Sequence, residues 1–180
     1  TVRLHYECKG AIAGLCITPL DASTRSPLAP HDASLAVRSV GLNFRDVLNV
    51  LGEYPGDEKW LDGDCAGKAL DVEAAVSHLS SGDAAFGLAR APLASRACAD
   101  ARLLARKPST LSFEAACTLP VTWSTVHVTF GRALVRRSSR VLVQAAAGGV
   151  GLVATEYAQL VDAIVAATVG SRLKHWHVEG

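Results

Sequence analysis

The sequence predicts a mixed α and β fold, with strands in the first part of the chain and a strand–helix–strand unit at its end. Three observations lead to this prediction. Short apolar stretches bounded by turn residues dominate up to about residue 105, which is typical of strands. Apolar residues at helical spacing extend from about residue 112 to 135. Beyond them a β-branched run, a glycine-rich turn, an apolar-periodic helix and a second apolar run follow one another.

The first part of the chain contains several strand candidates and one helix. Residues 1–20 alternate loosely between apolar and polar side chains and are predicted to form two short strands. Residues 33–40 are the next strand candidate. Between residues 41 and 52, four apolar side chains fit one face of a helix, namely Phe44, Val47, Leu48 and Leu51. Gly82-Asp83 predicts a turn into a further strand that begins at residue 84.

The last part of the chain reads as a helix followed by a β–α–β unit. Lys107-Pro108 ends the β-rich part, and Ser112 is a candidate N-cap for a helix that begins near Phe113. The run 141–143 is predicted to be a strand, and the apolar run 163–167 a second, parallel one. The residues between them predict a connecting helix, because apolar side chains recur there at helical spacing: Val153, Tyr157, Leu160 and Val161.

The glycine-rich turn before that helix is the clearest functional signal. A short strand, a tight glycine turn and a helix suit a nucleotide pyrophosphate, because glycines allow close backbone approach and the helix N-terminus offers unpaired N–H groups. In the G-x-G-x-x-G pattern the three glycine positions hold Ala146, Gly148 and Gly151, so alanine replaces the first glycine. With Gly149 and Val150, these are the predicted cofactor-binding residues of the turn. The alternative is a glycine- and alanine-rich turn that serves packing only.

The residues after the second strand indicate which dinucleotide would bind. A site for NAD usually has an acidic residue about 20 residues beyond the glycine turn, where it binds the ribose 2′-hydroxyl. This chain has no carboxylate there and carries a hydroxyl and two cations instead, Ser171, Arg172 and Lys174. Because cations suit a 2′-phosphate, the sequence predicts NADPH, with Ser171 and Lys174 as cofactor-binding residues. A solvated basic loop is the alternative interpretation.

Composition and charge argue against several classes of protein. A formal net charge of +1 gives no general attraction to nucleic acid or to a membrane surface. The chain has no apolar span of membrane length and no signal-peptide pattern, so we expect a cytoplasmic protein. The five cysteines lack Cys-x-x-Cys spacing, which predicts neither a disulfide framework nor structural zinc, and we expect them to be buried or half-buried. Since methionine is absent, the chain looks excised from a longer one.

Several stretches resemble the enoyl reductase domain of modular polyketide synthases and animal-type fatty acid synthases, within the medium-chain dehydrogenase/reductase superfamily. They occur in the family's order across nearly the whole chain: residues 40–48, 63–67, 82–89, 111–121, the glycine turn and 170–174. The resemblance implies a GroES-like β-barrel domain in residues 1–124, followed in residues 125–180 by the first half of a Rossmann domain. Because the family's Rossmann sheet has further strands, we expect the chain to be a truncated fragment that is inactive alone.

Asn43 and Asp64 distinguish the chain from zinc alcohol dehydrogenases, which it also resembles. Those enzymes carry a cysteine and a histidine at these positions, and without that thiolate and imidazole we expect no metal site. The resemblance therefore implies zinc-free, NADPH-dependent reduction of the α,β double bond of an enoyl thioester. The implied partners are an acyl carrier protein bearing the enoyl chain on phosphopantetheine, and neighbouring synthase domains. A stand-alone quinone or enone reductase, or a non-catalytic remnant of a synthase, is the alternative.

The same resemblance suggests three residues of the reaction site. Asn43 is predicted to be catalytic and to line the nicotinamide and substrate cleft, although asparagine here would also cap the following helix. Tyr54 matches a cleft tyrosine that could orient or protonate an enolate, and its alternative is a half-exposed loop aromatic. Thr125 resembles a threonine near the nicotinamide carboxamide, and its alternative is a helix threonine bonded to its own backbone.

Overall fold

The computed structural model describes three stretches of the chain: residues 1–20, 27–55 and 63–177. The chain divides into two compact units, Thr1–Val121 and Thr122–Gly180. Helix α3 (Pro120–Arg132) begins in the first unit and continues in the second. The predicted functional domains, a substrate domain in residues 1–124 and a cofactor-binding domain in residues 125–180, stay a prediction.

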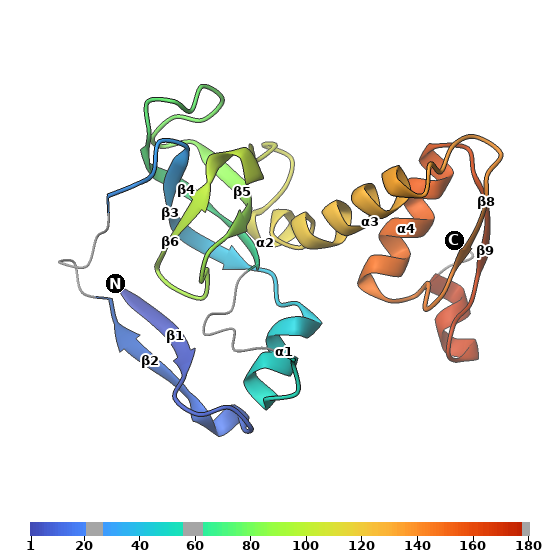
Figure 1. Cartoon of the computed structure of the whole chain (residues 1–180), viewed down its shortest axis with the longest axis horizontal. Coiled ribbons are helices and arrows are strands. Elements are labelled where there is room, and N and C mark those ends of the chain that lie inside the picture. The colour runs from blue at the N-terminus through green and yellow to red at the C-terminus, as the bar shows by residue number, and fades with distance from the viewer. Residues whose placement is uncertain (21–26, 56–62, 178–180) are drawn as a thin grey trace. The chain divides into compact units, whose positions relative to one another are not determined.

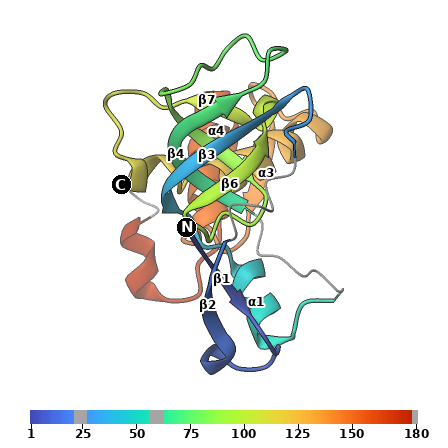
Figure 2. The same cartoon turned by 90° about the vertical axis from the view of Figure 1, so that its left-hand side faces the viewer.

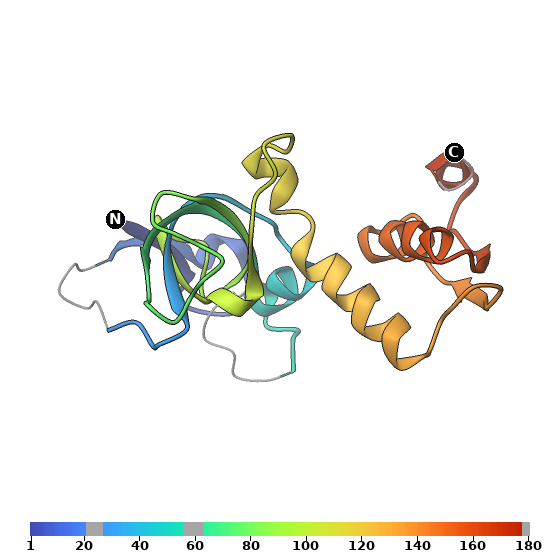
Figure 3. The same ribbon diagram turned by 90° about the horizontal axis from the view of Figure 1, so that it is seen from above.

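The described part of the first unit is built on two antiparallel sheets (Figure 1). One is a hairpin of β1 (Val2–Tyr6) and β2 (Leu15–Pro19), which confirms the two predicted strands in residues 1–20. The other has the strand order β6-β3-β4-β5-β7. Its strands are β3 (Asp32–Val40), β4 (Gly63–Val72), β5 (Ala84–Ala89), β6 (Arg96–Asp100) and β7 (Leu104–Arg106). Figure 2 shows β4, β3 and β6 side by side, and Figure 3 shows how this sheet curls.

Small side chains fill the core of this five-stranded sheet. Along β5, buried and half-buried residues alternate, so that Ala85, Gly87 and Ala89 face inward, as the two-residue period of a strand requires. Alanine dominates the rest of the cluster, with Leu35, Leu79 and Leu104 as its larger members. Two short 3-10 helices, η1 (Ile12–Gly14) and η3 (Ala101–Leu103), connect strands. A core of small side chains lets the strands of the curled sheet approach closely.

Helix α1 (Phe44–Leu51) confirms the predicted helix but turns its apolar face outward. Asn43 is its N-cap residue, and Gly52 ends it at a φ of +74°, a conformation that glycine adopts without strain. The buried side chains of α1 are Asp46, Asn49 and Val50. The predicted apolar face is half-buried at Leu48 and exposed at its other members: Phe44, Val47 and Leu51.

The helical stretch after residue 112 is broken, which corrects the prediction of one helix from 112 to 135. Helix α2 (Phe113–Ala116) has Ser112 as its N-cap, whose Oγ accepts a hydrogen bond from Ala115 N at 3.0 Å. The chain leaves the helix at Cys117 and begins α3 at Pro120. Proline has no N–H to give an earlier turn and its ring suits the first position of a new helix, so a break before residue 120 follows.

The second unit is the predicted strand–helix–strand. Strands β8 (Arg140–Val143) and β9 (Ile164–Ala167) are parallel and joined by helix α4 (Gly149–Leu160), with Val141 opposite Val165. Buried residues from α3, β8, α4 and the turn between β8 and α4 form its core: Val126, Phe130, Val143, Ala146, Ala154 and Ala158. Beyond α4, Asp162 has a φ of +55°, a left-handed conformation that aspartate tolerates better than most residues. A short 3-10 helix, η4 (Arg172–His177), follows β9.

Cysteine burial corrects part of the sequence analysis. Cys65 and Cys117 are buried and Cys16 is half-buried, as expected, but Cys8 and Cys98 are exposed. Cys98 lies on β6 between the buried Ala97 and Ala99, so the alternation of the strand turns it to the outer face. All five thiols are free. No helix in the described residues is long and apolar enough to cross a membrane.

Candidate functional site

A buried carboxylate holds together three parts of the first unit. Asp64, the second residue of β4, is only 2% exposed. Its Oδ2 accepts a hydrogen bond from Asn43 Nδ2 at 3.1 Å, and its Oδ1 accepts one from the Val121 backbone N–H at 2.7 Å. The Asp64 backbone carbonyl accepts a third bond, from Gly41 N at 3.1 Å. One residue therefore connects the N-terminus of α1, the first strand residues of β4 and the start of α3.

Two glycines make this close approach possible. A Cβ on Gly41 would strike the carbonyl oxygen of Cys117 and lie 2.8 Å from Asp64 Cβ. A Cβ on Gly63 would lie 3.2 Å from Asn43 Nδ2. Since both distances are too short for ordinary contacts, side chains at these positions would displace the amide of Asn43 or the carboxylate of Asp64.

Asn43 is both the N-cap residue of α1 and a member of this cluster. The Asp46 carboxylate accepts a hydrogen bond from the Asn43 backbone N–H at 2.9 Å, which is one half of a capping box. In the other half the Asn43 side chain accepts a hydrogen bond from the Asp46 backbone N–H, while its Nδ2 donates to Asp64 Oδ2. Asn43 therefore caps α1 and bonds to Asp64 in one conformation, and its predicted role in a nicotinamide and substrate cleft stays a prediction.

Burial dominates the electrostatics of the cluster. It raises the pKa of Asp64, and the negative charge of Asp46 adds to this, while the bonds from Asn43 and Val121 work in the opposite direction. Burial, with the nearby Asp64 and Cys117, raises the pKa of the Cys65 thiol to about 12. Cys65 is therefore a neutral thiol at physiological pH and a poor nucleophile.

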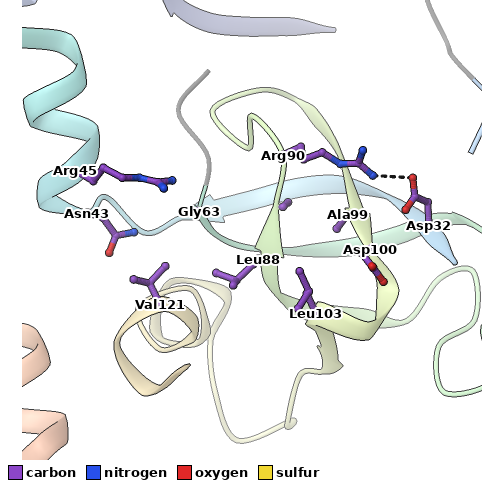
Figure 4. Close-up of a pocket in the computed structure, with 11 residues that line it drawn as sticks. Asp32, Asn43, Arg45, Gly63, Leu88, Arg90, Ala99, Asp100, Leu103 and Val121 are labelled. Carbon is purple, nitrogen blue, oxygen red and sulfur yellow. Dashed lines mark hydrogen bonds and ion pairs between the residues drawn. The ribbon is translucent and has the colours of Figure 1, made fainter. Parts of the chain in front are cut away.

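A pocket of about 590 Å³ opens beside Asn43, a size that suits a small-molecule ligand. Figure 4 shows Asn43 and Val121 at one end of this pocket, and Arg90 paired with Asp32 at the other. The Arg90–Asp32 ion pair measures 2.7 Å. Apolar side chains line the space between the ends, namely Leu88, Ala89, Ala99 and Leu103. The pocket thus has an apolar middle between two polar ends, with Asn43 and Arg45 at one end and Arg90 with Asp32 at the other.

Tyr54 lies away from that pocket. It follows the C-terminus of α1, is half-buried, and its backbone N–H donates to Leu48 O at 3.3 Å. Because α1 has eight residues, Asn43 and Tyr54 are separated by about 12 Å of helix. Tyr54 is not among the described residues that line the pocket. Its predicted catalytic role stays a prediction.

The glycine turn forms an uncapped helix N-terminus in the second unit. Gly148 is the N-cap residue of α4 and supplies no side-chain hydrogen bond, so the N–H groups of the first turn, from Gly149, Val150 and Gly151, lack intrahelical acceptors. Gly148, Gly149 and Val150 are exposed. An exposed, uncapped N-terminus of a twelve-residue helix suits an anionic pyrophosphate.

The shape of this turn explains which of its positions need small residues. Ala146, at the first glycine position, is completely buried, and Ala145 before it has the left-handed φ of +53°. A Cβ on Gly151 would strike Ala145 O and lie 2.7 Å from Ala146 Cα. Alanine is thus accommodated at position 146, whereas position 151 admits only glycine without a shift of the backbone.

The predicted phosphate-binding residues follow β9. The end of β9 lies against the glycine turn, because Ala146 N donates to Thr168 O at 2.9 Å and Thr168 N donates to Val143 O at 3.0 Å. Three residues later Ser171 is exposed, and its carbonyl accepts a bond from Lys174 N at 3.1 Å at the start of η4. Lys174 is also exposed. The structure therefore brings the strand that leads to these residues next to the turn.

Thr125 lies inside α3 and is exposed. It belongs to the second unit, as do the glycine turn and the basic residues. Within that unit, Gly149 faces the neighbouring Thr122, since a Cβ on this glycine would lie 3.8 Å from Thr122 Cγ2. The role of Thr125 at the nicotinamide stays a prediction.

Asp64 is the functional candidate that sequence reasoning missed. The sequence comparison placed it where zinc enzymes have a histidine, but its contact with Asn43 depends on the pairing of distant segments. The available signal was an acid inside a strand of small residues, since a buried carboxylate needs partners. In the described residues, no group of three or more His, Cys, Asp or Glu side chains is placed to hold a metal ion.

Comparison with known proteins gives several close matches, although no family model matches the chain. The chain is 41% identical over 160 residues to the spectinabilin polyketide synthase system protein NorB of Streptomyces orinoci, which covers 88% of this chain and 7% of NorB. Its structure matches the CurK enoyl reductase with a TM-score of 0.88 and 34% identity, over 99% of this chain and 56% of that one.

A second solved structure is similar as well. The mycobacterial protein Rv1454c, complexed with NADPH, matches with a TM-score of 0.85 and 25% identity, over 99% of this chain and 56% of that one. The chain thus spans a little over half the length of these solved structures and less than a tenth of NorB. The match to CurK confirms the predicted fold class, a β-rich GroES-like domain followed by the first β–α–β part of a Rossmann domain.

Proposed function

Because the chain belongs to the enoyl reductases of the medium-chain dehydrogenase/reductase superfamily, we propose that it is part of the reductase domain of a polyketide synthase. The proposed reaction is NADPH-dependent reduction of the α,β double bond of an enoyl thioester carried on acyl carrier protein. NADPH would supply a hydride to the β-carbon. The electron pair of the double bond would then form an enolate with the thioester carbonyl, and the α-carbon of this enolate would take a proton. The observation that supports this most is the uncapped N-terminus of α4 beside the glycine turn.

The second unit is proposed to bind the cofactor. The first-turn N–H groups of α4 would hold the pyrophosphate, in a turn formed by Ala146, Gly148, Gly149, Val150 and Gly151. Gly151 would let this turn close tightly, since a Cβ there would strike Ala145 O. Ser171 and Lys174, which follow the strand bonded to this turn, would contact the 2′-phosphate. The residues present thus suit a phosphorylated dinucleotide in shape and in charge.

The first unit is proposed to bind the acyl chain. The apolar lining of the pocket suits a hydrocarbon chain, and Asn43 at its end would orient the reacting groups. Tyr54 is proposed to orient or protonate the enolate, and Thr125 to contact the nicotinamide carboxamide. The reaction as proposed needs no metal ion. An acyl carrier protein and neighbouring synthase domains are the proposed partners, and a role in the cytoplasm fits these partners.

One other activity is supported by a specific observation. The chain also resembles, at 25% identity and a TM-score of 0.81, the Escherichia coli quinone oxidoreductase complexed with NADPH. A stand-alone quinone or enone reductase would use the same turn and the same pocket. The substrate therefore decides between the two proposals.

The test uses the full-length protein, NADPH and two substrates, crotonyl-pantetheine and a benzoquinone. We expect the thioester to cause oxidation of NADPH. We also expect its double bond to be saturated, which mass spectrometry of the product detects. Oxidation with the quinone alone would favour the second activity. Failure to bind NADPH in a fluorescence titration would favour a non-catalytic remnant and contradict both reductase proposals.

A further inference from the structure

We infer that the pair of Arg90 and Asp32, at the end of the pocket opposite Asn43, selects acyl chains that carry an oxygen beyond the reacting double bond. The inference rests on the proposed function, in which this pocket holds the acyl chain. It names the substrate class: a chain with a distal ketone or hydroxyl, as opposed to a plain hydrocarbon. Figure 4 shows Arg90 and Asp32 joined at that end. Every described residue that lines the pocket belongs to the first unit.

Strand β6 holds both partners of this pair in place. Arg90 directly follows β5, and its backbone N–H donates a hydrogen bond to Cys98 O at 2.9 Å. Asp32 is the first residue of β3 and lies opposite Asp100 on β6. The two side chains meet in the bond from Arg90 Nη2 to Asp32 Oδ2 at 2.7 Å. Because the pair is formed before a ligand binds, little side-chain ordering opposes binding.

The pair keeps hydrogen-bonding capacity after this contact. A guanidinium has five N–H donors and a carboxylate has two oxygens, and the contact uses one nitrogen and one oxygen. Among the residues that the structure describes, Asp32 is the one hydrogen-bond partner of the Arg90 side chain. A ketone oxygen can accept a hydrogen bond from the remaining donors of Arg90. A hydroxyl can do the same and can also donate to Asp32.

Charge at this end of the pocket is balanced, which favours a neutral oxygen over an anion. The other acid that lines it, Asp100, accepts hydrogen bonds from Arg102 Nε at 2.9 Å and from Arg102 Nη2 at 2.6 Å. These bonds lower the pKa of Asp100 to about 2, so Asp100 is an anion at neutral pH. Two arginines thus face two carboxylates, and the two pairs leave no net charge to attract a carboxylate or a phosphate of the ligand.

The apolar middle of the pocket makes the position of the ligand oxygen matter. Leu88 and Leu103 are the largest side chains of that stretch. A hydrocarbon that extends past it brings methylene groups against the pair and displaces water, and no hydrogen bond replaces those that are lost. A ketone or a hydroxyl restores them. Since the Arg90 side chain is 64% exposed, water still competes, and we expect a difference of about 3- to 10-fold in KM.

The test compares thioesters of equal chain length in the full-length protein with NADPH. The substrates are 2-octenoyl-pantetheine and its derivatives with a ketone or a hydroxyl at C5 or C7. We expect the wild type to show a KM about 3- to 10-fold lower for the best ketone and the best hydroxyl than for the hydrocarbon. A hydroxyl that binds more tightly than the ketone supports a further bond to Asp32. No preference at either position would overturn the inference.

Arg90→Met is the decisive variant, because methionine keeps an apolar stem and has no N–H donor. A ketone has no proton to donate to Asp32, so we expect the ratio of the KM for the hydrocarbon to the KM for the ketone to fall to about one. The matched control is Arg106→Met on β7. Arg106 is 62% exposed, pairs with Asp83 at 2.9 Å, and is not among the described residues that line the pocket. The control should keep the wild-type ratio, and an equal change in both variants would overturn the inference.

A second readout does not depend on turnover. Calorimetric titration of the wild type with octanoyl-pantetheine and with its 5-oxo and 7-oxo derivatives measures binding of saturated chains that cannot be reduced. We expect the Kd of the better ketone to be about 3- to 10-fold lower than that of the hydrocarbon. Equal Kd values would overturn the inference even if Arg90→Met failed to fold. If the ketone bound more tightly but no enoyl thioester were reduced, the selectivity of the pocket would stand and the proposed function would fail.

Discussion

In the glycine turn, the space around each position decides whether it can hold a side chain. Ala146 occupies the first glycine position and is buried without strain, whereas Gly151 has the backbone of Ala145 and Ala146 directly against it. A departure from the glycine pattern is therefore harmless at one position and excluded at another, and only the contacts of each position tell them apart.

Replacing Gly151 by alanine should damage the second unit. The added Cβ would collide with Ala145 O, so the turn must shift, and we expect a loss of about 1–3 kcal/mol in unfolding free energy together with weaker NADPH binding. Thermal denaturation and a fluorescence titration measure the two effects. Gly131→Ala in α3 is the control, because a Cβ there meets nothing within 4 Å and should stabilise the helix slightly. Equal effects of both substitutions would contradict this account.

Lys174→Ala should separate the two nicotinamide cofactors. The loss of one charged contact to a 2′-phosphate is worth about 1.5–3 kcal/mol, so the Kd of NADPH should rise roughly 10- to 150-fold while that of NADH stays unchanged. Titration of both cofactors by nicotinamide fluorescence tests this. Lys68→Ala, an exposed lysine on β4, is the control. An equal loss for both cofactors would refute the assignment of Lys174.

At the scale of elements, caps and breaks follow local chemistry closely. Ser112 caps α2 as its position predicts, and Pro120 begins α3 after the chain has left α2. Helix α1 is different, because its apolar residues indicate where a helix forms but not which face is buried. Its buried side chains are Asp46, Asn49 and Val50.

The cap of α2 provides a test at this scale. Ser112→Ala removes the acceptor for Ala115 N, and we expect a loss of about 1 kcal/mol in unfolding free energy, measured by chemical denaturation. Ser124→Ala, an exposed position inside α3, should change stability little, since alanine is a good helix former. A Ser112 variant as stable as the Ser124 variant would argue that α2 needs no cap.

At the scale of the whole molecule, the buried Asp64 should make stability depend on pH. Burial raises the pKa of Asp64, so the folded chain binds this proton more tightly than the unfolded chain does. The stabilisation is complete below the ordinary Asp pKa of 3.8 and is lost as the pH rises through the raised value. Among the described residues, the charges of Asp46, Cys65 and Cys117 interact with that of Asp64.

The difference in melting temperature between wild type and Asp64→Asn isolates this dependence from that of other groups. We expect the variant to gain on the wild type as the pH rises from 4 toward neutrality, the range that follows upward from the ordinary pKa of 3.8. Asp100 acts in the opposite direction, since its bonds from Arg102 lower its pKa to about 2. The stability of Asp100→Asn should therefore fall relative to that of the wild type as the pH rises from about 2 toward 4. If the difference in melting temperature between Asp64→Asn and the wild type did not change with pH, burial would not raise the pKa of Asp64.

The sequence alone determined most of the elements and the predicted nucleotide turn. Strand alternation, helical periodicity, the serine cap and the glycine turn are local patterns, and each depends on residues only a few positions apart. The parallel pairing of β8 with β9 followed as well, because a strand–helix–strand of this length connects parallel strands.

Only the tertiary structure decided the partners of Asn43 and the direction of its amide. Asn43, Asp64 and Val121 are far apart in the chain, and their contact depends on how β3, β4 and the start of α3 meet. The outward turn of the α1 apolar face and the exposure of Cys98 were decided in the same way. The physical reason is that burial and hydrogen bonding depend on which segments pack together, whereas a local pattern records only the conformation that neighbouring residues prefer.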